Sequence, residues 1–386
     1  MNVRLGIMGA GQLGMYLCEA AARLGVQTCV LTPDASAPAC HKADKTIVGA
    51  LDHAPTVELF IEHCDIITFE LEDIPNETLN QLILAERDGQ VRVNPGVDTL
   101  FMLKDKGLQK AWLRQHGFPH LPHMLLNGFT TDPMTSAHDL GFPVVQKARC
   151  GGYDGRGVQV IESATDIDRL WDTPSILEAY LDERREISVL CARNTEGQLE
   201  SYPPVSMEFN NSLNALSLVY SPAGISEEIA TQATRIAEDI VNTLEGVGLF
   251  AIEMFVSPDG DVLVNEISPR VHNSGHITLE ACSASQFEQH IRAVLGLPLA
   301  QVESLAPASM VNILYEDALA PSCPNRPATY QRDDVPAIVH WYGKTPGRVG
   351  RKMGHITVLD RNPEAAAWQA NAALVSLSQP RGDYAA

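Results

Sequence analysis

Short apolar runs alternate with helix-like segments along the first quarter of the chain. The run VRLGIM is followed by a glycine turn and by MYLCEAAARLG, a helical pattern that ends at Gly25, a residue type common at helix ends. The apolar runs VQTCVL, KTIVG and DIITFE come next, together with helical segments such as ETLNQLILAER. Strands that alternate with helices predict a parallel, doubly wound sheet, which we expect to occupy residues 1–95.

The pattern changes beyond this region. The helical stretch DTLFMLKDKGLQKAWLRQHG leads into FPVVQKAR, GVQVIES, SILEAYL and REISVLCAR, apolar runs separated by turns that predict an antiparallel sheet. An amphipathic helix, SEEIATQATRIAEDIVNTLE, precedes the strands GLFAIEMFV and DVLVNEI, which the turn SPDG joins as a hairpin. MVNILY and IVHWYG are strand-like, and RKMGHITVLD and a final helix follow them. We therefore expect an α/β and α+β multidomain chain, with domains at residues 1–95, 96–306 and 307–386.

Composition and charge limit the possible functions. A chain of 386 residues exceeds what one hydrophobic core usually serves, which agrees with several domains. The formal net charge of −20 argues against a nucleic-acid partner, so an anionic ligand must be bound by local arginines, lysines or backbone N–H groups. No apolar run is long enough to span a membrane, and MNVRLGIMGAG lacks the features of a signal peptide, so we expect a cytoplasmic protein with no membrane partner. The eight cysteines form no CxxC pair, and we expect reduced thiols.

The turn GAGQLG carries Gly9, Gly11 and Gly14 between a predicted strand and a predicted helix. Glycines at this spacing let the backbone approach a phosphate, and a helix N-terminus favours an anion. Asp34, after the second strand, is placed to accept from a ribose hydroxyl, as in nicotinamide-dependent enzymes. A plain tight turn and a dinucleotide site carry similar weight at this point.

Two carboxylates stand on neighbouring strands of the predicted hairpin. Glu253 in AIEMFV and Glu266 in LVNEIS, with the amide of Asn265, can converge on one face of it. Hard oxygen ligands of this kind suit Mg²⁺, which is commonly shared with nucleotide phosphates. Strand glutamates beside solvent are the ordinary alternative, but apolar residues flank both positions, and an uncompensated acid there costs free energy. The pattern therefore favours a magnesium site.

Donor groups crowd the segment SPRVHNSGH, which follows directly after Glu266. These groups are Arg270, His272, Asn273, Ser274 and His276. A lone histidine is usually structural, whereas so many donors beside a metal site point to an anionic substrate. A second cluster of cations lies near the C-terminus, where Lys344 and Arg348 precede RKMGHITV. It is either a solvated basic face or an anchor for a phosphate monoester.

The stretch KARCGGYDGRG, residues 147–157, places glycines around Tyr153, Asp154 and Arg156 directly after the apolar run FPVV. By itself it fits either a hairpin turn or a flexible loop over phosphates. Together with GAGQLG, TFELE, SILEAYLDERREISV, AIEMFV, NEISPRVHNSGH and HWYGKTPGRVGRKMGH, it resembles the ATP-grasp superfamily, and within it the 5-(carboxyamino)imidazole ribonucleotide synthases of purine biosynthesis. These stretches run in order from Gly9 to His355, so the resemblance covers nearly the whole chain.

The resemblance implies a doubly wound N-terminal domain, a two-part ATP-grasp domain and a small β-rich C-terminal domain. It implies an ATP-dependent carbon–nitrogen ligase that uses ATP and Mg²⁺ to activate bicarbonate as carboxyphosphate. Carbon dioxide is then passed to the exocyclic amine of aminoimidazole ribonucleotide, and ADP and phosphate are the other products. The resemblance also suggests a homodimer.

The resemblance further assigns site residues by motif. ATP would be contacted by Lys106, Lys147, Gly152, Tyr153, Asp154, Gly155, Arg156, Gly157, Val158, Glu178, Ala179, Tyr180, Leu181, Glu186, Asn265 and Glu266. Magnesium would be held by Glu253 and Glu266. The imidazole ribonucleotide would contact Gln12, Leu13 and Glu70, and its phosphate would meet Lys344, Arg351 and Lys352. Bicarbonate and the transferring carboxyl group would be surrounded by Tyr153, Arg156, Arg270, His272 and Asn273.

The chain departs from the family pattern at Lys106 and Phe209. Lys106 stands where relatives usually carry arginine, which keeps the charge but loses the bidentate geometry, and Phe209 stands where a histidine is expected. Other functions also stay open. A formate-dependent glycinamide ribonucleotide transformylase shares the plan but has a loop richer in serine than GGYDGRG. A nicotinamide-dependent oxidoreductase would leave the glutamate pair unexplained, and a non-catalytic relative would not need that pair.

Overall fold

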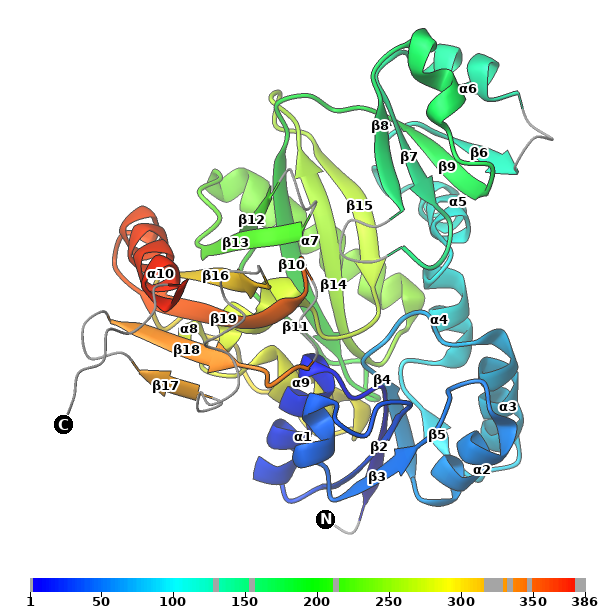
Figure 1. Ribbon diagram of the computed structural model, residues 1–386, viewed down its shortest axis with the longest axis vertical. Helices are drawn as coiled ribbons and strands as arrows, with labels where there is room; N and C mark the ends of the chain where they lie inside the picture. The colour runs from blue at the N-terminus through cyan, green and yellow to red at the C-terminus, as the bar shows by residue number, and fades with distance from the viewer. Residues whose placement is uncertain are drawn as a thin grey trace.

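The computed structural model of the chain describes residues 3–127, 132–152, 157–210, 215–315, 329–331, 336–345 and 349–378. The described strands form three sheets. Figure 1 shows a small sheet at the lower right, a second small sheet with α6 (Pro133–Leu140) at the upper right, and the largest sheet between them and the C-terminal helix. The predicted loop residues Tyr153, Asp154, Gly155 and Arg156 lie outside the described residues, as does Arg348.

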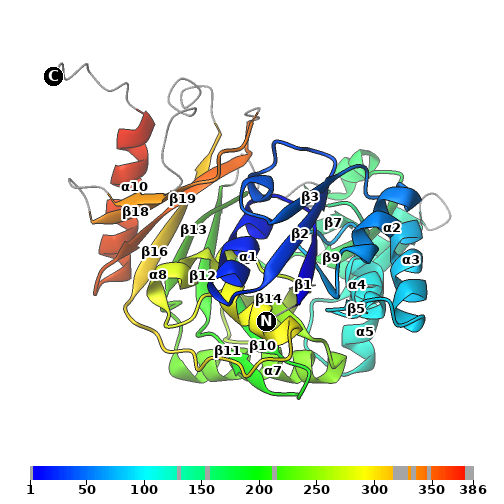
Figure 2. The same cartoon turned by 90° about the horizontal axis from the view of Figure 1, so that it is seen from below.

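A parallel sheet occupies the N-terminal part of the chain, which confirms the doubly wound prediction. Its order is β3-β2-β1-β4-β5, formed by β1 (Arg4–Met8), β2 (Gln27–Thr32), β3 (Lys45–Val48), β4 (Ile66–Phe69) and β5 (Arg92–Val93). Figure 2 shows α1 (Gln12–Arg23) on one face of this sheet, and α2 (Ala54–Glu62) and α3 (Asn76–Arg87) on the other. Neighbouring strand side chains point to opposite faces, so Ile7 is buried with α1 and Met8 with α2 and α3.

The long helical pattern after this sheet is divided into α4 (Val97–Leu103) and α5 (Lys106–Gln115). The carboxylate of Asp105 accepts from the backbone N–H groups of Gly107 at 2.8 Å and Leu108 at 3.2 Å. Such a cap satisfies donors that the first turn of a helix leaves open. The cap therefore fixes where α5 begins, and this helix supplies lysines to the site described below.

The strands predicted from FPVVQKAR onward fall into two sheets rather than one. The smaller, antiparallel sheet has the order β6-β9-β7-β8, formed by β6 (His123–Asn127), β7 (Val144–Ala148), β8 (Val158–Ile161) and β9 (Pro174–Ala179). The next strand, β10 (Arg185–Arg193), belongs instead to a ten-stranded sheet of order β15-β14-β10-β12-β13-β16-β19-β18-β17, with β11 beside β10. Its other strands are β11 (Leu199–Ser201), β12 (Val205–Asn210), β13 (Ala215–Ser221), β14 (Gly248–Val256), β15 (Val262–Ser268), β16 (Ala308–Leu314), β17 (Thr329–Gln331), β18 (Ala337–Trp341) and β19 (Lys352–Leu359).

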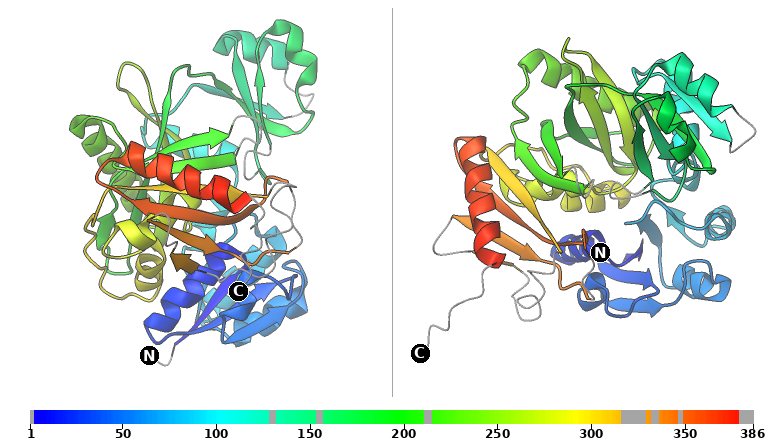
Figure 3. Two further views of the ribbon diagram at one scale, coloured as in Figure 1. Left: turned by 60° about the vertical axis from the view of Figure 1, so that its left-hand side comes forward. Right: turned by 45° about the horizontal axis from the view of Figure 1, so that its top comes forward.

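The ten-stranded sheet runs across the predicted boundary between residues 306 and 307. β13 pairs with β16, so strands from both sides of this boundary share one set of backbone hydrogen bonds. Figure 3 shows α10 (Pro363–Ser378) lying along the C-terminal strands, and its alanines at 366, 370 and 373 are buried against them.

The remaining helical segments are η1 (Pro38–His41), η3 (Ala164–Arg169), α7 (Glu227–Leu244), η4 (Asn273–Ile277), α8 (Thr278–Ala281) and α9 (Gln286–Val294). None of the described helices has the length and the apolar character needed to cross a membrane.

One buried apolar cluster joins the three parts of the chain. It contains Tyr16 of α1, Phe287 of α9, Leu190 of β10 and Tyr342, which follows β18. The rings of Tyr16 and Phe287 lie 4.9 Å apart between centroids. The N-terminal sheet is therefore attached to the central sheet through a continuous core, and the predicted domain limits remain a prediction.

A stack of buried imidazole rings lies at the same junction. The ring centroids of His276 and His355 are 4.8 Å apart, and those of His340 and His355 are 4.3 Å apart, with 13° between the planes in both pairs. Both ring nitrogens of His276 lack a hydrogen-bond partner among the described residues. Burial, and then the nearby His340, lowers the pKa of His276 well below its usual range. This histidine therefore lies in the core of the junction.

We expect a His276→Phe variant to be less sensitive to acid than the wild type. A histidine that is kept neutral when folded but binds a proton when unfolded contributes stability above about pH 6.5, and this stability is lost as the pH falls further. Phenylalanine keeps the ring stacking and has no titrating nitrogen. Thermal unfolding at about pH 7.5 and pH 5.5 should show a smaller fall in Tm for the variant, whereas His41→Phe, at an exposed position, should leave the fall unchanged. An equal fall in all three proteins would refute this account of His276.

Candidate active site

A cavity of about 700 Å³ lies where the three sheets approach one another. Many of the predicted site residues line it: Gln12, Leu13, Glu70, Lys106, Lys147, Gly152, Val158, Glu178, Ala179, Leu181, Glu186, Glu253, Asn265, Glu266, Arg270, His272, Asn273 and Lys352. The predicted residues Gly157, Tyr180, Lys344 and Arg351 are described but are not among the lining residues. The ammonium group of Lys344 lies 5.4 Å from the ring centroid of Tyr342, and the charge of Arg351 acts on Asp34. The structure therefore gathers groups that are far apart in the sequence, while their individual roles stay predictions.

A β-bulge places the two glutamates and the asparagine beside one another. Glu253 on β14 pairs with Glu266 on β15, but the next residue, Met254, pairs with Val264, so Asn265 is an extra residue in β15. A bulge breaks the alternation of a strand and re-aims its side chains. Asn265 and Glu266 consequently both reach the cavity, although they are adjacent in the sequence.

The two carboxylates differ in their ionisation. Burial, and then the neighbouring Glu266 and Glu186, raises the pKa of Glu253 to about 8. Burial also opposes ionisation of Glu266, but the adjacent Lys106 and then Lys147 outweigh it and lower its pKa. Two partly buried carboxylates at paired positions are unfavourable without a compensating cation. The set of two carboxylates and one amide oxygen therefore fits a magnesium ion, which prefers oxygen ligands.

Three lysines lie beside the carboxylates of Glu178 and Glu266. Lys110 lies 2.7 Å from one oxygen of Glu178, and Lys147 forms an ion pair with the other. Together, and against the effect of burial, they lower the pKa of Glu178 to about 2. Lys147 also donates to the side-chain oxygen of Asn265 at 2.7 Å, and Lys106 pairs with Glu266. Positive charge is thus held beside the candidate metal ligands.

Lys110, which pairs with the cavity residue Glu178 but does not itself line the cavity, was not expected from the sequence. It lies four residues after Lys106, so both lysines lie on one face of α5. Gly107, Gln109 and Leu113 are buried on the same helix, and the spacing of the two lysines along it could have revealed Lys110. Glu72 and Arg184 do line the cavity, and they lie within the quoted stretches TFELE and SILEAYLDERREISV, but no role was assigned to either.

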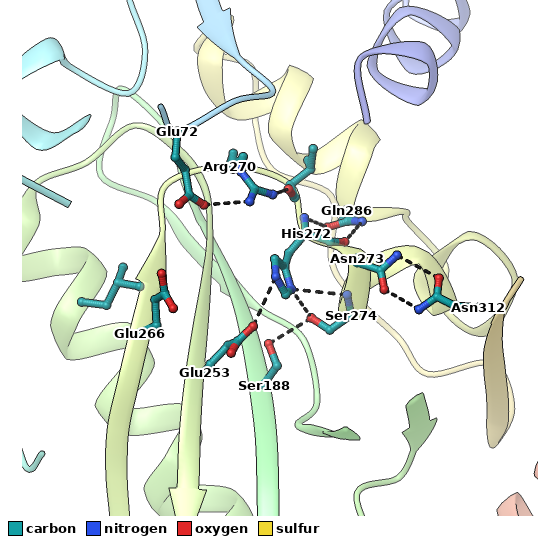
Figure 4. Close-up of polar contacts among 12 residues, drawn as sticks. Glu72, Ser188, Glu253, Glu266, Arg270, His272, Asn273, Ser274, Gln286 and Asn312 are labelled. Carbon is teal, nitrogen blue, oxygen red and sulfur yellow. Dashed lines mark hydrogen bonds and ion pairs between the residues drawn. The ribbon is translucent and has the colours of Figure 1, made fainter. Parts of the chain in front are cut away.

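The segment after β15 is held in place by amide contacts (Figure 4). The side chain of Gln286 accepts from the backbone N–H of His272 at 2.9 Å and donates to its carbonyl oxygen at 2.7 Å. Asn273 and Asn312 exchange side-chain hydrogen bonds of 3.1 Å and 2.7 Å. The protein's own contacts therefore orient several donors of this segment.

His272 is oriented toward one of the candidate metal ligands. Its Nδ1 accepts from the backbone N–H of Ser274 at 3.3 Å, so in the neutral ring the proton is on Nε2. Nε2 lies 3.2 Å from a carboxylate oxygen of Glu253. By contrast, Ser274 and His276 are fully buried and do not line the cavity, so the expectation that they share its donor set is wrong in geometry. The short helical turn η4 carries them away from it into the protein interior.

The glycine turn GAGQLG is occupied by the protein itself. The carboxylate of Glu70 accepts from the backbone N–H groups of Gly11 and Gly14, at the N-terminus of α1. A Cβ atom added at Gly9 would lie 2.4 Å from Glu70, and Gly9 has a φ of +102°, so this approach requires glycine. Asp34 accepts from both the N–H and the hydroxyl of Ser36. The place where a dinucleotide phosphate would bind is therefore filled, which favours the tight-turn interpretation.

The part of the cavity near β9 combines apolar and charged groups. Val145, Leu121 and Phe255 line it, and the guanidinium of Arg184 lies 5.0 Å from the ring of Phe255. Arg184 also forms an ion pair of 3.1 Å with Glu186, the predicted acceptor for the ribose hydroxyls. Phe209, which replaces the expected histidine, adds to the apolar lining.

Comparison with known proteins gives family matches over most of the chain. Residues 2–104 match the ribonucleotide synthetase preATP-grasp domain, residues 111–287 the ATP-grasp domain, and residues 308–369 the phosphoribosylaminoimidazole carboxylase C-terminal domain. The chain is 38% identical to an N5-carboxyaminoimidazole ribonucleotide synthase of Synechococcus elongatus, with 92% of this chain and 89% of that protein covered. It is 36% identical to a phosphoribosylaminoimidazole carboxylase of Schizosaccharomyces pombe, but it spans only 65% of that longer protein.

Solved structures give the same result. The chain matches the crystal structure of N5-carboxyaminoimidazole ribonucleotide synthetase from Thermotoga maritima with a TM-score of 0.84 and 38% identity, over 97% of this chain and 98% of that one. It also matches the Aspergillus clavatus N5-carboxyaminoimidazole synthase in complex with ADP and 5-aminoimidazole ribonucleotide, with a TM-score of 0.85, 30% identity and the same coverage of both chains. The chain therefore belongs to the N5-carboxyaminoimidazole ribonucleotide synthase family of ATP-grasp ligases.

Proposed function

We propose that this chain carboxylates the exocyclic amine of 5-aminoimidazole ribonucleotide with bicarbonate, at the expense of ATP, in purine biosynthesis. The products are 5-(carboxyamino)imidazole ribonucleotide, ADP and phosphate. One observation carries the proposal: a single cavity holds the Glu253–Glu266 pair together with Arg270 and His272. The relatives named for this reaction, and the one bound to ADP and 5-aminoimidazole ribonucleotide, support it.

The reaction proceeds in two transfers. First, an oxygen of bicarbonate bonds to the γ-phosphorus of ATP, the bond to the β-phosphate oxygen breaks, and ADP and carboxyphosphate result. Carboxyphosphate then separates into carbon dioxide and phosphate. The amine nitrogen bonds to the carbon, and its proton is taken up by phosphate. Carboxyphosphate hydrolyses readily, so a cavity that excludes water favours transfer over loss.

Acidic side chains of the cavity would bind the metal ion, and basic side chains would bind the anionic substrates. Glu253, Asn265 and Glu266 would hold Mg²⁺, which neutralises phosphate charge when it is bound. Lys147 would meet a nucleotide phosphate, and the contact of its ammonium group with Asn265 beside the candidate metal ligands supports this role. Arg270 and His272 supply donors for bicarbonate and for the developing carboxyl group. Catalysis would thus rest on position and charge, without a covalent enzyme intermediate.

Binding of the ribonucleotide is the next part of the proposal. Gln12 and Leu13 at the start of α1 line the cavity on the side of the N-terminal sheet, and Lys352 lines it from β19. Lys352 could bind the phosphate monoester, with Lys344 and Arg351 nearby in the chain. A homodimer and a cytoplasmic location remain part of the proposal on the strength of the family resemblance.

The decisive assay measures ADP formation with ATP, Mg²⁺ and 5-aminoimidazole ribonucleotide, with and without bicarbonate. We expect ADP to form at a rate that depends on bicarbonate and that formate does not replace. Turnover with formate and glycinamide ribonucleotide alone would instead identify the transformylase. Tight NADH binding without ADP binding would identify an oxidoreductase, and the proposal would then be wrong.

A Glu266→Gln variant should lose ATP turnover by about 100-fold or more while keeping its fold. Glutamine has nearly the same shape but lacks the charge that a magnesium ion needs, and it leaves Lys106 without its ionic partner. Initial rates and thermal unfolding of the same preparation measure both effects. Glu208→Gln on β12, at an exposed position outside the cavity, is the matched control and should retain activity. Full turnover in Glu266→Gln would exclude the proposed metal role.

A Glu253→Gln variant should gain stability relative to the wild type as the pH rises. The pKa of Glu253 is raised to about 8, above the usual 4.5, so the unfolded chain releases this proton first and the wild type loses stability between those values. The variant has no such loss. The difference between the two proteins in the pH-dependent part of the free energy of unfolding, here called the gap, should reach a few kcal/mol by about pH 8. Thermal unfolding of both proteins between about pH 5.5 and pH 8.5 measures it, and added Mg²⁺ should narrow the gap by stabilising the wild type. A gap that does not vary with pH would contradict the burial of this carboxylate.

A further inference from the structure

Glu72 lies in the loop that follows β4, two residues after Glu70. Because Glu70 is bound to the N-terminus of α1, the start of this loop is anchored to the N-terminal sheet. Glu72 reaches the cavity from there, and its side chain is 20% exposed. No role was expected for it from the sequence.

An ion pair connects Glu72 to the other side of the cavity. A carboxylate oxygen of Glu72 lies 2.9 Å from Nη2 of Arg270, whose side chain is 19% exposed. Arg270 follows β15, the strand that carries Asn265 and Glu266. The contact visible in Figure 4 therefore joins the N-terminal part of the chain to the strand with the candidate metal ligands.

The guanidinium of Arg270 is fixed but not saturated. Nη1 donates to the carbonyl oxygen of Val271 at 2.9 Å, and Nη2 faces Glu72. Nε is buried and has no hydrogen-bond partner among the described residues. A buried charged donor without an acceptor is costly, but Nε is too deeply buried for an oxyanion to reach it from the cavity. An oxyanion from outside the chain would therefore meet the part of the Arg270 side chain that stays exposed beside Glu72.

Without Glu72, other acids would compete for this arginine. Glu253 and Glu266 lie within the same cavity, and the charge of Glu72 acts on both Glu253 and Lys106. A long guanidinium side chain released from its partner has many rotamers to choose from. The ion pair keeps Arg270 in one of them and on its own side of the cavity.

We propose that Glu72 is a positioning residue for the carboxylation, which holds Arg270 in the cavity lining so that its guanidinium meets the oxyanion derived from bicarbonate. The inference rests on the proposed function. The position of Arg270 would then depend on the N-terminal part of the chain, because Glu72 belongs to that part. The only ion pair of Glu72 among the described residues is the one with Arg270, so we assign its role to that contact.

The test compares the effect of a variant on KM for bicarbonate with its effect on KM for ATP. In a Glu72→Gln variant we expect KM for bicarbonate to rise by about 10-fold, while KM for ATP stays within about 2-fold, since the loss of a supporting partner typically costs about 10- to 100-fold. Glu72→Asp keeps the charge and should recover part of the loss. A variant that was merely misfolded would lower the apparent kcat and Tm and would leave both KM values unchanged.

The matched control is Glu77→Gln, which removes the same charge from an exposed position in the first turn of α3, outside the cavity. It should leave KM for bicarbonate within about 2-fold, because Glu77 neither lines the cavity nor contacts Arg270 among the described residues. An unchanged KM for bicarbonate in Glu72→Gln would overturn the inference. So would a lower KM, because Glu72 would then be a competitor that the oxyanion must displace. If the wild type forms no ADP in response to bicarbonate, the proposed function itself fails, and this outcome is distinct from both.

Discussion

Two partly buried carboxylates at paired positions, Glu253 and Glu266, impose the constraint on which the site depends. Like charges opposite each other weaken a strand pair, and burial increases the free-energy cost. The surrounding elements offset that cost. α5 brings Lys106 against Glu266, and the segment after β15 brings His272 against Glu253. The helix thus supplies a positive charge and the segment a polar partner, and the cost that remains favours binding of a divalent cation.

The same principle applies at the edge of the cavity nearest the N-terminal sheet. There the positive end of α1 is balanced by Glu70, a side chain of the protein itself, so this helix is not available as a phosphate site. The apolar core that contains Tyr16 and Phe287 ties α1 to the central sheet. Internal compensation of charge and continuous burial together let three parts of one chain form a single cavity.

Local patterns were sufficient to predict much of this protein. Alternation of strands and helices predicted the N-terminal sheet, and the hairpin with its glutamates was evident because both partners lie close in sequence. Long-range pairings were not accessible in this way. GAGQLG was ambiguous because the group that decides its role, Glu70, is 59 residues from Gly11. β9 and β10 follow each other directly, yet they belong to different sheets, because pairing partners elsewhere in the chain determine where each strand lies. His276 was placed with its sequence neighbours, whereas a short helical turn redirects it.

The extra residue in β15 changes what a polar pair inside a strand means. In VLVNEIS, the buried core positions are Val262 and Val264 before the bulge and Ile267 after it, so the interval between core residues changes from two to three. The bulge shifts the alternation of side chains by one residue. Two adjacent polar side chains can then point into the cavity, and the following residues return to the apolar face. Removing one residue there would restore strict alternation and leave space for a single polar group. A polar dipeptide inside an otherwise apolar strand can therefore mark a bulge, and with it a binding site, in the amino-acid sequence itself.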